Sequence, residues 1–417
     1  MNGLEIQEHA GEEYKRLVNN AKWTLASLNY APRFDERNIV DLERHNLTDE
    51  TFVLLTGKAT LLVGEAAERV ELEPLKYYNV RAGIWHNIIV SKDARVLVAE
   101  NANTSKDNTD YLDLATRRVF QKRPSFEEVL PGMYLLKVPF GPVWTGVNLI
   151  RLDDGRFVLI DSSHLAPEKY LLPALEELGV KTGDIAWLLN THVHGDHIGG
   201  HHALVTQYGL KTCTLDAAAD ALRDPVKVAI RVRTRFPKNS PAPQSYLKGV
   251  EPDKVVAEGE LLEGRFRVIA TPGHDDDCLT WIDTKTGTAF TGDSLQANGT
   301  PCQGVGFYRS RAAYCATLEK LAKEPIENIV CGHVYDGIGD VIKGRAAVRA
   351  AIDYSAARVK LYGEKIAAYV KAGVPVEEEP VTLALKLIGE VGCGMPDALF
   401  LALHTVSEHL KEFGYAS

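Results

Sequence analysis

Three histidines and one aspartate lie within the six positions from His192 to His197, separated by two residues from the apolar run IAWLL. In an extended segment, side chains at alternate positions point the same way, so His192 and His194 can hold one metal ion. Asp196 and His197 follow as a helix begins, and they can turn toward a neighbouring ion. Imidazole and carboxylate are ligands that zinc and similar first-row metals accept. The segment therefore predicts a metal site at the end of a strand.

The HxHxDH pattern resembles the signature of the metallo-β-lactamase superfamily, and three later turns match other ligands of that family. These turns are TPGH ending at His274, TGD ending at Asp293 and CGH ending at His333. Each turn follows an apolar, strand-like run. An early acidic residue on a strand end also belongs to the family pattern, and Asp161 matches it. The resemblance covers roughly residues 130–344, about half of the chain.

The resemblance implies an αββα fold and a dinuclear centre. Its ligands would be His192, His194 and His274 on one ion, Asp196, His197 and His333 on the second, and Asp293 bridging both. The implied cofactors are two divalent ions, zinc first and iron or manganese as alternatives. The implied activity is that of a metal-dependent hydrolase, in which a hydroxide bridging the two ions attacks a substrate carbonyl. Asp196 and Asp293 are then the catalytic side chains, with Asp196 as a proton relay.

The ligands leave the substrate open among esters, thioesters, lactones and amides. A phosphodiester hydrolase, an iron-dependent redox enzyme of the same fold and a non-catalytic small-ligand sensor are the alternatives. The turn CGHVYDG is similar to that of hydroxyacylglutathione hydrolases, whereas DDDC after His274 departs from their pattern. The candidates for substrate contacts are Tyr308, Tyr335, Arg231 and Arg235. Their alternative roles are aromatic packing for the tyrosines and a solvated basic face for the arginines. Structural or exposed roles are expected for His164, His201, His202, His404 and His409.

The N-terminal region carries a second group of candidate ligands. Residues 42–50 with Gly57, and then residues 83–86, are similar to the two cupin motifs. This resemblance implies a small cupin-like β-barrel with His45, Glu50 and His86 at metal-ligand positions. The usual first histidine is replaced by Glu43, and the usual proline by Arg81. We therefore expect the barrel and leave open whether it binds an additional metal.

The remaining elements must position these ligands. A polar helix is expected before Trp23, and strands alternate with helices after Met133, which favours an α/β core. The segment from Asp224 to Pro252 is long, irregular and rich in proline and arginine, as a lid would be. We expect three domains: a cupin-like barrel over 1–118, the αββα domain over 119–343, and a helical extension over 344–417.

Composition narrows the partners. The formal net charge is −9, and no run of apolar residues is long enough to span a bilayer. These features favour a small-molecule substrate over nucleic acid or a membrane. The six cysteines show no regular spacing. They are expected to be reduced thiols of a cytoplasmic protein. A homodimer is left open.

Overall fold

The chain folds into two units, residues 1–123 and 124–417, each with its own core. The computed structural model describes residues 6–19, 22–104, 108–120, 124–141, 143–164, 166–394 and 396–415. Among these residues, no helix is long and apolar enough to cross a bilayer.

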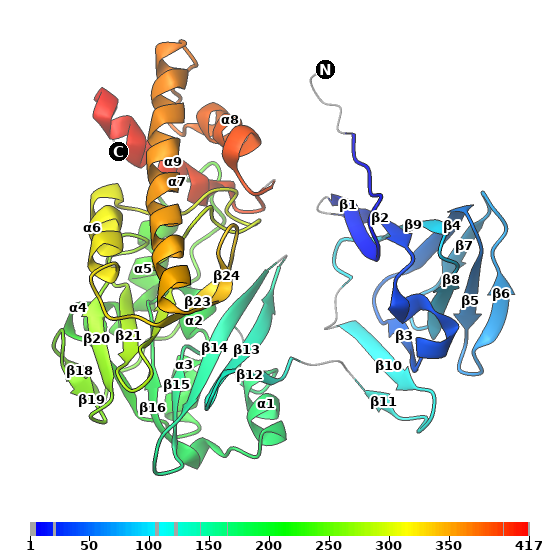
Figure 1. Cartoon of the computed structure of the whole chain (residues 1–417), viewed down its shortest axis with the longest axis horizontal. Coiled ribbons are helices and arrows are strands. Elements are labelled where there is room, and N and C mark those ends of the chain that lie inside the picture. The colour runs from blue at the N-terminus through cyan, green and yellow to red at the C-terminus, as the bar shows by residue number, and fades with distance from the viewer. Residues whose placement is uncertain are drawn as a thin grey trace. The chain divides into compact units, whose positions relative to one another are not determined.

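The first unit is built from two β-sheets (Figure 1). The five-stranded sheet has the order β1-β2-β9-β4-β7, with β1 Tyr14–Asn19, β2 Trp23–Asn29, β9 Arg95–Asn101, β4 Glu50–Thr56 and β7 Tyr77–Val80. The six-stranded sheet has the order β11-β10-β3-β8-β5-β6, with β11 Val119–Phe120, β10 Thr109–Asp113, β3 Asp41–His45, β8 His86–Val90, β5 Ala59–Val63 and β6 Glu68–Glu71. Burial alternates along β2 and β9, and their buried side chains join one core with Phe52 and Ile88. The all-β expectation is confirmed, and the cupin-like assignment stays a prediction.

The second unit contains two larger sheets. The seven strands of the first, in spatial order, are β12 Phe126–Leu130, β13 Met133–Phe140, β14 Val143–Arg151, β15 Phe157–Ile160, β16 Ile185–Leu189, β17 Thr212–Leu215 and β18 Lys254–Val256. The six strands of the second are β19 Leu261–Leu262, β20 Phe266–Ala270, β21 Leu279–Asp283, β22 Thr288–Gly292, β23 Asn328–Tyr335 and β24 Gly339–Lys343. The four strands β15 to β18 pair in parallel, as do β22 and β23.

Helices cover both outer faces of this pair of sheets. The helices are α1 Leu171–Glu177, α2 Gly195–Ile198, α3 His201–Thr206, α4 Asp216–Arg223, α5 Pro225–Arg233, α6 Arg311–Leu321, α7 Arg345–Lys371, α8 Val381–Val391 and α9 Leu399–Leu410. One core lies between the sheets and includes Ile160, Trp281 and Phe290. A second packs α1 and α3 on the first sheet, and a third packs α6, α7 and α9 on the second. These four layers confirm the αββα expectation, and α7 is the long orange helix in Figure 1.

Two local expectations are wrong. Residues 6–19 form no helix, because Tyr14–Asn19 pairs with β2 as a strand. The segment from Asp224 to Pro252 is not irregular throughout, because its first part is helix α5, with Pro225 in the first turn and Asp224 as N-cap. Helix α8 lies within the helical extension that is expected over 344–417, and Leu383, Ala384, Leu387 and Ile388 bury one of its faces.

The strands bring distant parts of the sequence to one edge. Asp161 directly follows β15, and His192 lies three residues past the end of β16, its parallel neighbour. Asp293 directly follows β22, and His333 lies near the end of the adjacent parallel strand β23. Because the carboxyl ends of parallel strands share an edge, these side chains converge.

The C-terminal helices should contribute to the stability of the second unit. Leu403 of α9 is fully buried in the core shared with α6 and α7. Leu403→Ala should therefore lower the free energy of unfolding of this unit by about 2–5 kcal/mol. The exposed Leu385 of α8 provides the control, since Leu385→Ala removes the same atoms from solvent contact rather than from a core. Urea unfolding measures both, and equal small effects would contradict the shared core.

Candidate metal centre

All seven predicted ligands lie around one buried space. Three groups of side chains have ligand atoms within 4.8 Å of one another: His192, His194 and His274; His192, His197 and Asp293; and Asp196, His197 and His333. The first and last groups are the two triads that the sequence predicts. The fold therefore brings together residues that are up to 141 positions apart, as His192 and His333 are.

Asp293 lies between the two triads. Its Oδ2 is 3.5 Å from Nε2 of His274 and 3.5 Å from Nε2 of His333, and its Oδ1 is 3.4 Å from Nε2 of His197. The side chain is almost fully buried. One carboxylate thus faces histidines of both triads, which is the position that a bridging ligand needs.

The hydrogen bonds of the histidines leave ligand atoms facing inward. Nδ1 of His333 donates to the carbonyl oxygen of Trp144 at 2.7 Å, and Nδ1 of His274 donates to that of Phe307 at 3.1 Å. A carbonyl only accepts, so in a neutral ring Nε2 presents its lone pair to the carboxylates. Nε2 of His192, Nε2 of His197 and Oδ1 of Asp293 are buried without a hydrogen bond among the described residues. Such atoms are rare in proteins, and bound cations would satisfy them.

The charges of the site depend on one another. Burial would raise the pKa of Asp293, but His333 and His197 outweigh it and hold the pKa well below its usual range. Burial together with His197 and His194 lowers the pKa of His192. Burial lowers the pKa of His333 as well, but Asp293 and Asp196 reverse the effect and raise it to about 10. Ionised carboxylates thus face imidazoles whose protons a divalent cation would displace.

Two aspartates outside the ligand set orient the histidines. Asp161 accepts from Nδ1 of His197 at 2.8 Å and from the backbone N–H of Thr191 at 2.8 Å. Asp275 lies 3.0 Å from Nε2 of His194, which leaves Nδ1 of that ring facing His274. Asp275 is itself fully buried and pairs with Arg231 and Arg309. Such contacts fix the direction of a ligand ring and strengthen it as a donor.

Glycine is required beside two of the ligands. A Cβ on Gly332 would lie 2.5 Å from Oδ1 of Asp293 and 2.7 Å from Cε1 of His197. Gly292 has a positive φ of 49°, and a Cβ there would meet Oγ1 of Thr191 at 2.2 Å. The glycines of the TGD and CGH turns thus let the two sheets approach closely enough to share ligands.

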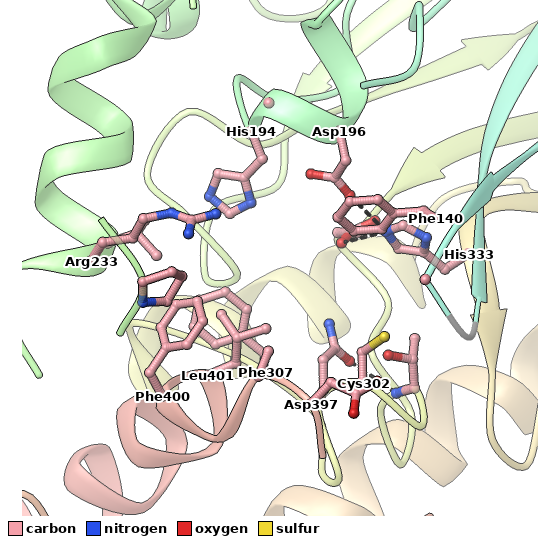
Figure 2. Close-up of a pocket in the computed structure, with 18 of the residues that line it drawn as sticks. Phe140, His194, Asp196, Arg233, Cys302, Phe307, His333, Asp397, Phe400 and Leu401 are labelled. Carbon is pink, nitrogen blue, oxygen red and sulfur yellow. Dashed lines mark hydrogen bonds and ion pairs between the residues drawn. The ribbon is translucent and has the colours of Figure 1, made fainter. Parts of the chain in front are cut away.

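A cavity of about 410 Å³ opens onto the centre and is lined by five of the seven residues, namely His194, Asp196, His274, Asp293 and His333. Figure 2 shows Asp196 and His333 in contact, with Arg233 beside His194 and with Phe307, Phe400 and Leu401 facing the same space. Mostly apolar side chains form the wall, as in many small-molecule sites.

The four residues proposed for substrate contacts do not line this cavity. Tyr308 is buried against His409, and Tyr335 is buried with its hydroxyl near Gln296. Arg231 pairs with the aspartates of the DDDC turn, and Arg235 lies 3.8 Å from Glu408. Arg233, which the sequence reasoning missed, lines the cavity instead. Its signal was the run of arginines at alternate positions on one segment.

The other histidines have packing partners. His201 is fully buried and contacts Ser162 at 2.7 Å, and Nε2 of His404 donates to the carbonyl of Val232 at 2.9 Å. Nδ1 of His202 donates to the carbonyl of Gly249, and the ring of His164 packs on Phe140. Structural roles therefore account for these side chains.

The N-terminal unit holds a second cluster. Glu43, His45, Glu50 and His86 have ligand atoms within 4.8 Å of one another, beside a cavity of about 180 Å³. Oε2 of Glu50 is 3.1 Å from Nε2 of His45 and 2.9 Å from Nε2 of His86. Nδ1 of His86 donates to the carbonyl oxygen of Ile84, so a neutral ring points its Nε2 lone pair at the carboxylate. The three predicted side chains therefore meet in an arrangement that a cation would fit.

The contact between Asp275 and His194 can be tested by substitution. Asp275→Asn removes a charged acceptor, so the chain should lose metal about 10- to 100-fold more readily to a chelator. Asp276→Asn is the matched control, because exposed Asp276 pairs with the same two arginines but has no contact with His194. Equal metal retention by the two variants in a competition titration would show that Asp275 does not support the site.

Comparisons with known proteins agree with this geometry. Residues 145–333 match the family described as the metallo-beta-lactamase superfamily. A hydroxyacylglutathione hydrolase of Chelativorans sp. (strain BNC1) is 28% identical over 231 residues, which cover 54% of this chain and 72% of that protein. A hydroxyacylglutathione hydrolase of Cereibacter sphaeroides (strain ATCC 17023) is 31% identical over 185 residues, 43% of this chain and 58% of the other.

The fold also has a solved counterpart. A metallo-beta-lactamase family protein from Thermus thermophilus aligns with a TM-score of 0.52 and 22% identity, over 69% of this chain and 95% of that one. The family match spans Asp161 and all seven predicted ligands, the last of which is His333. Residues 145–333 therefore form a metallohydrolase domain of the metallo-beta-lactamase superfamily.

Proposed function

We propose that the protein hydrolyses a carbonyl compound, an ester, thioester, lactone or amide, at a dinuclear centre made by the seven residues. The observation that carries this proposal is the cavity that opens onto five of those residues. Its wall is mainly apolar, which suits an acyl group better than a nucleic acid backbone. The names of the curated relatives, hydroxyacylglutathione hydrolases, favour acyl transfer to water in the same way.

The residues present determine how such a site would work. Two divalent ions held here would bring the pKa of a water molecule toward neutrality and polarise a carbonyl oxygen. Asp293 keeps the two triads at a fixed separation, since it contacts histidines of both. Asp161 and Asp275 hold the imidazoles in their ligand orientation. We propose zinc as the resident metal, because imidazole and carboxylate ligands suit it.

We assign proton transfer to Asp196. It lines the cavity, and its side chain is 17% exposed, against 4% for that of Asp293. It therefore presents more of its carboxylate to a substrate than Asp293 does. Asp196 would accept a proton from the attacking water and pass it to the departing alcohol, thiol or amine as the bond of that group to the carbonyl carbon breaks.

Metal analysis of the purified full chain tests the centre. Wild-type protein should contain about two zinc-like ions in this domain, and His192→Ala should lose them together with esterase and thioesterase activity. His45→Ala removes a histidine of the other unit and should keep both the ions and the activity. Predominant iron would favour an iron-dependent redox enzyme. Cleavage of phosphodiesters and of no carbonyl compound would favour a phosphodiester hydrolase. A folded, metal-free wild type that cannot be reconstituted would contradict the proposal.

We also propose that Glu50 and His86, with His45 and Glu43, hold one further divalent ion. The support is that two buried imidazoles face the same carboxylate oxygen. In the full chain, Glu50→Gln and His86→Ala should each remove about one ion while the hydrolase keeps its own. Asp49→Asn, beside the cluster and exposed, serves as the control. Unchanged metal content in all three variants would show that hydrogen bonds alone satisfy these side chains.

A further inference from the structure

Three arginines occupy alternate positions along α5 and the residue pair that follows it, and they differ in their partners. Arg231 pairs with Asp275, Asp276 and Asp277. Arg235 lies 3.8 Å from Glu408. Arg233 forms no ion pair within the part of the chain that the structure describes, and its guanidinium lies 5.6 Å from the ring centre of Phe400. Arg233 is thus a cation without a carboxylate among the described residues.

Arg233 lies in the wall of the active-site cavity. It is the one arginine or lysine among the described residues that line this space, and its neighbours there include Val232, Phe400 and Leu401. Figure 2 shows its guanidinium directed toward His194. Burial lowers the pKa of Arg233, whereas Asp196 is close enough to raise it. The guanidinium is therefore partly removed from water and near the metal ligands.

This placement of a cation is unfavourable in free energy unless an anion binds to it. A half-buried cation loses part of its hydration, and a paired anion compensates for that loss. Arg231 and Arg235 compensate for the lost hydration through ion pairs with carboxylates of the protein, and Arg233 has no such pair among the described residues. A planar guanidinium fits a carboxylate through two parallel hydrogen bonds. The one other charged residue of the cavity wall outside the ligands is Asp397, which Figure 2 places beside Cys302 and away from Arg233.

We propose that Arg233 binds a carboxylate of the substrate, so that the substrate class is an acyl compound with a free carboxylate separated by an apolar segment from the carbonyl that is cleaved. This inference rests on the proposed hydrolase function. The apolar segment would lie along Phe307, Phe400 and Leu401, which line the same cavity as Arg233 and the metal ligands. Arg233 is a specificity residue in this account and takes no part in bond cleavage.

A pair of substrates matched in length tests the proposal. The mono-4-nitrophenyl ester of adipic acid and 4-nitrophenyl hexanoate have the same carbon chain and differ in the terminal carboxylate. Wild-type enzyme should prefer the adipate ester about 10-fold or more in kcat/KM. Arg233→Gln should lower that value about 10- to 100-fold, mainly through KM, and should leave the hexanoate rate nearly unchanged. Arg233→Lys should retain part of the preference.

Controls separate the carboxylate subsite from the hydrolase itself. Lys227→Gln removes an exposed charge from the same helix and should change kcat/KM for neither ester. A wild type without preference for the adipate ester, or an Arg233→Gln variant that slows both esters equally, would overturn the subsite. Calorimetric titration of the metal-loaded protein with adipate and with hexanoate provides a readout without catalysis. If neither ester is cleaved, Arg233-dependent binding of adipate upholds the subsite while the hydrolase proposal fails, and equal binding overturns both.

Discussion

The buried carboxylate of Asp293 is the constraint on which the rest of the site depends. Its oxygens face imidazoles of both triads at 3.4–3.5 Å, and almost none of its surface reaches solvent. A negative charge in such a place has to be balanced by cations or by protonated imidazoles. Both sheets, the glycine turns and the outer aspartates are arranged around that requirement. The candidate metal centre is therefore a property of the whole αββα domain rather than of one motif.

The fold meets this requirement through strand ends and close backbone approach. The first sheet contributes the loop after β16, and the second contributes the ends of β20, β22 and β23. Gly332 and Gly292 admit no side chain, and so Gly332 can lie against Asp293 and His197, and Gly292 against Thr191. The C-terminal helices add Phe400 and Leu401 to the cavity wall. The ligands thus determine the chemistry, while later parts of the chain shape what can reach them.

The sequence predicts which side chains the fold brings together at this site, because the signal of each one is local. The HxHxDH run and the TGD and CGH turns show both residue type and position after a strand, so the two triads can be assigned without knowledge of the fold. Contacts between distant side chains leave no such local pattern. In the sequence, Asp275 is noticeable only because the DDDC turn departs from the family pattern. Its role cannot be seen there, because its partners Arg231 and Arg309 lie 44 and 34 positions away. For the same reason the sequence suggests Arg231 and Arg235 for the substrate, whereas Arg233 faces the cavity.

The secondary structure shows the same limit. Strong apolar runs such as FVLI and IAWLL predict strands correctly, and the period of the 27-residue helix α7 predicts a helix. The polar segment Tyr14–Asn19 has no apolar pattern of its own and becomes a strand because it pairs with β2. Helix α8 lies in the expected helical extension, but β-branched residues and Gly389 weaken its local signal, and packing against α7 and α9 stabilises it.

Anomalous X-ray scattering at a metal absorption edge, from crystals of the full chain, tests the central claim most directly. The account predicts two peaks about 3.5–4 Å apart on either side of the Asp293 carboxylate, one beside His192, His194 and His274 and the other beside Asp196, His197 and His333. A single peak away from Asp293, or none in metal-supplemented crystals, would contradict it.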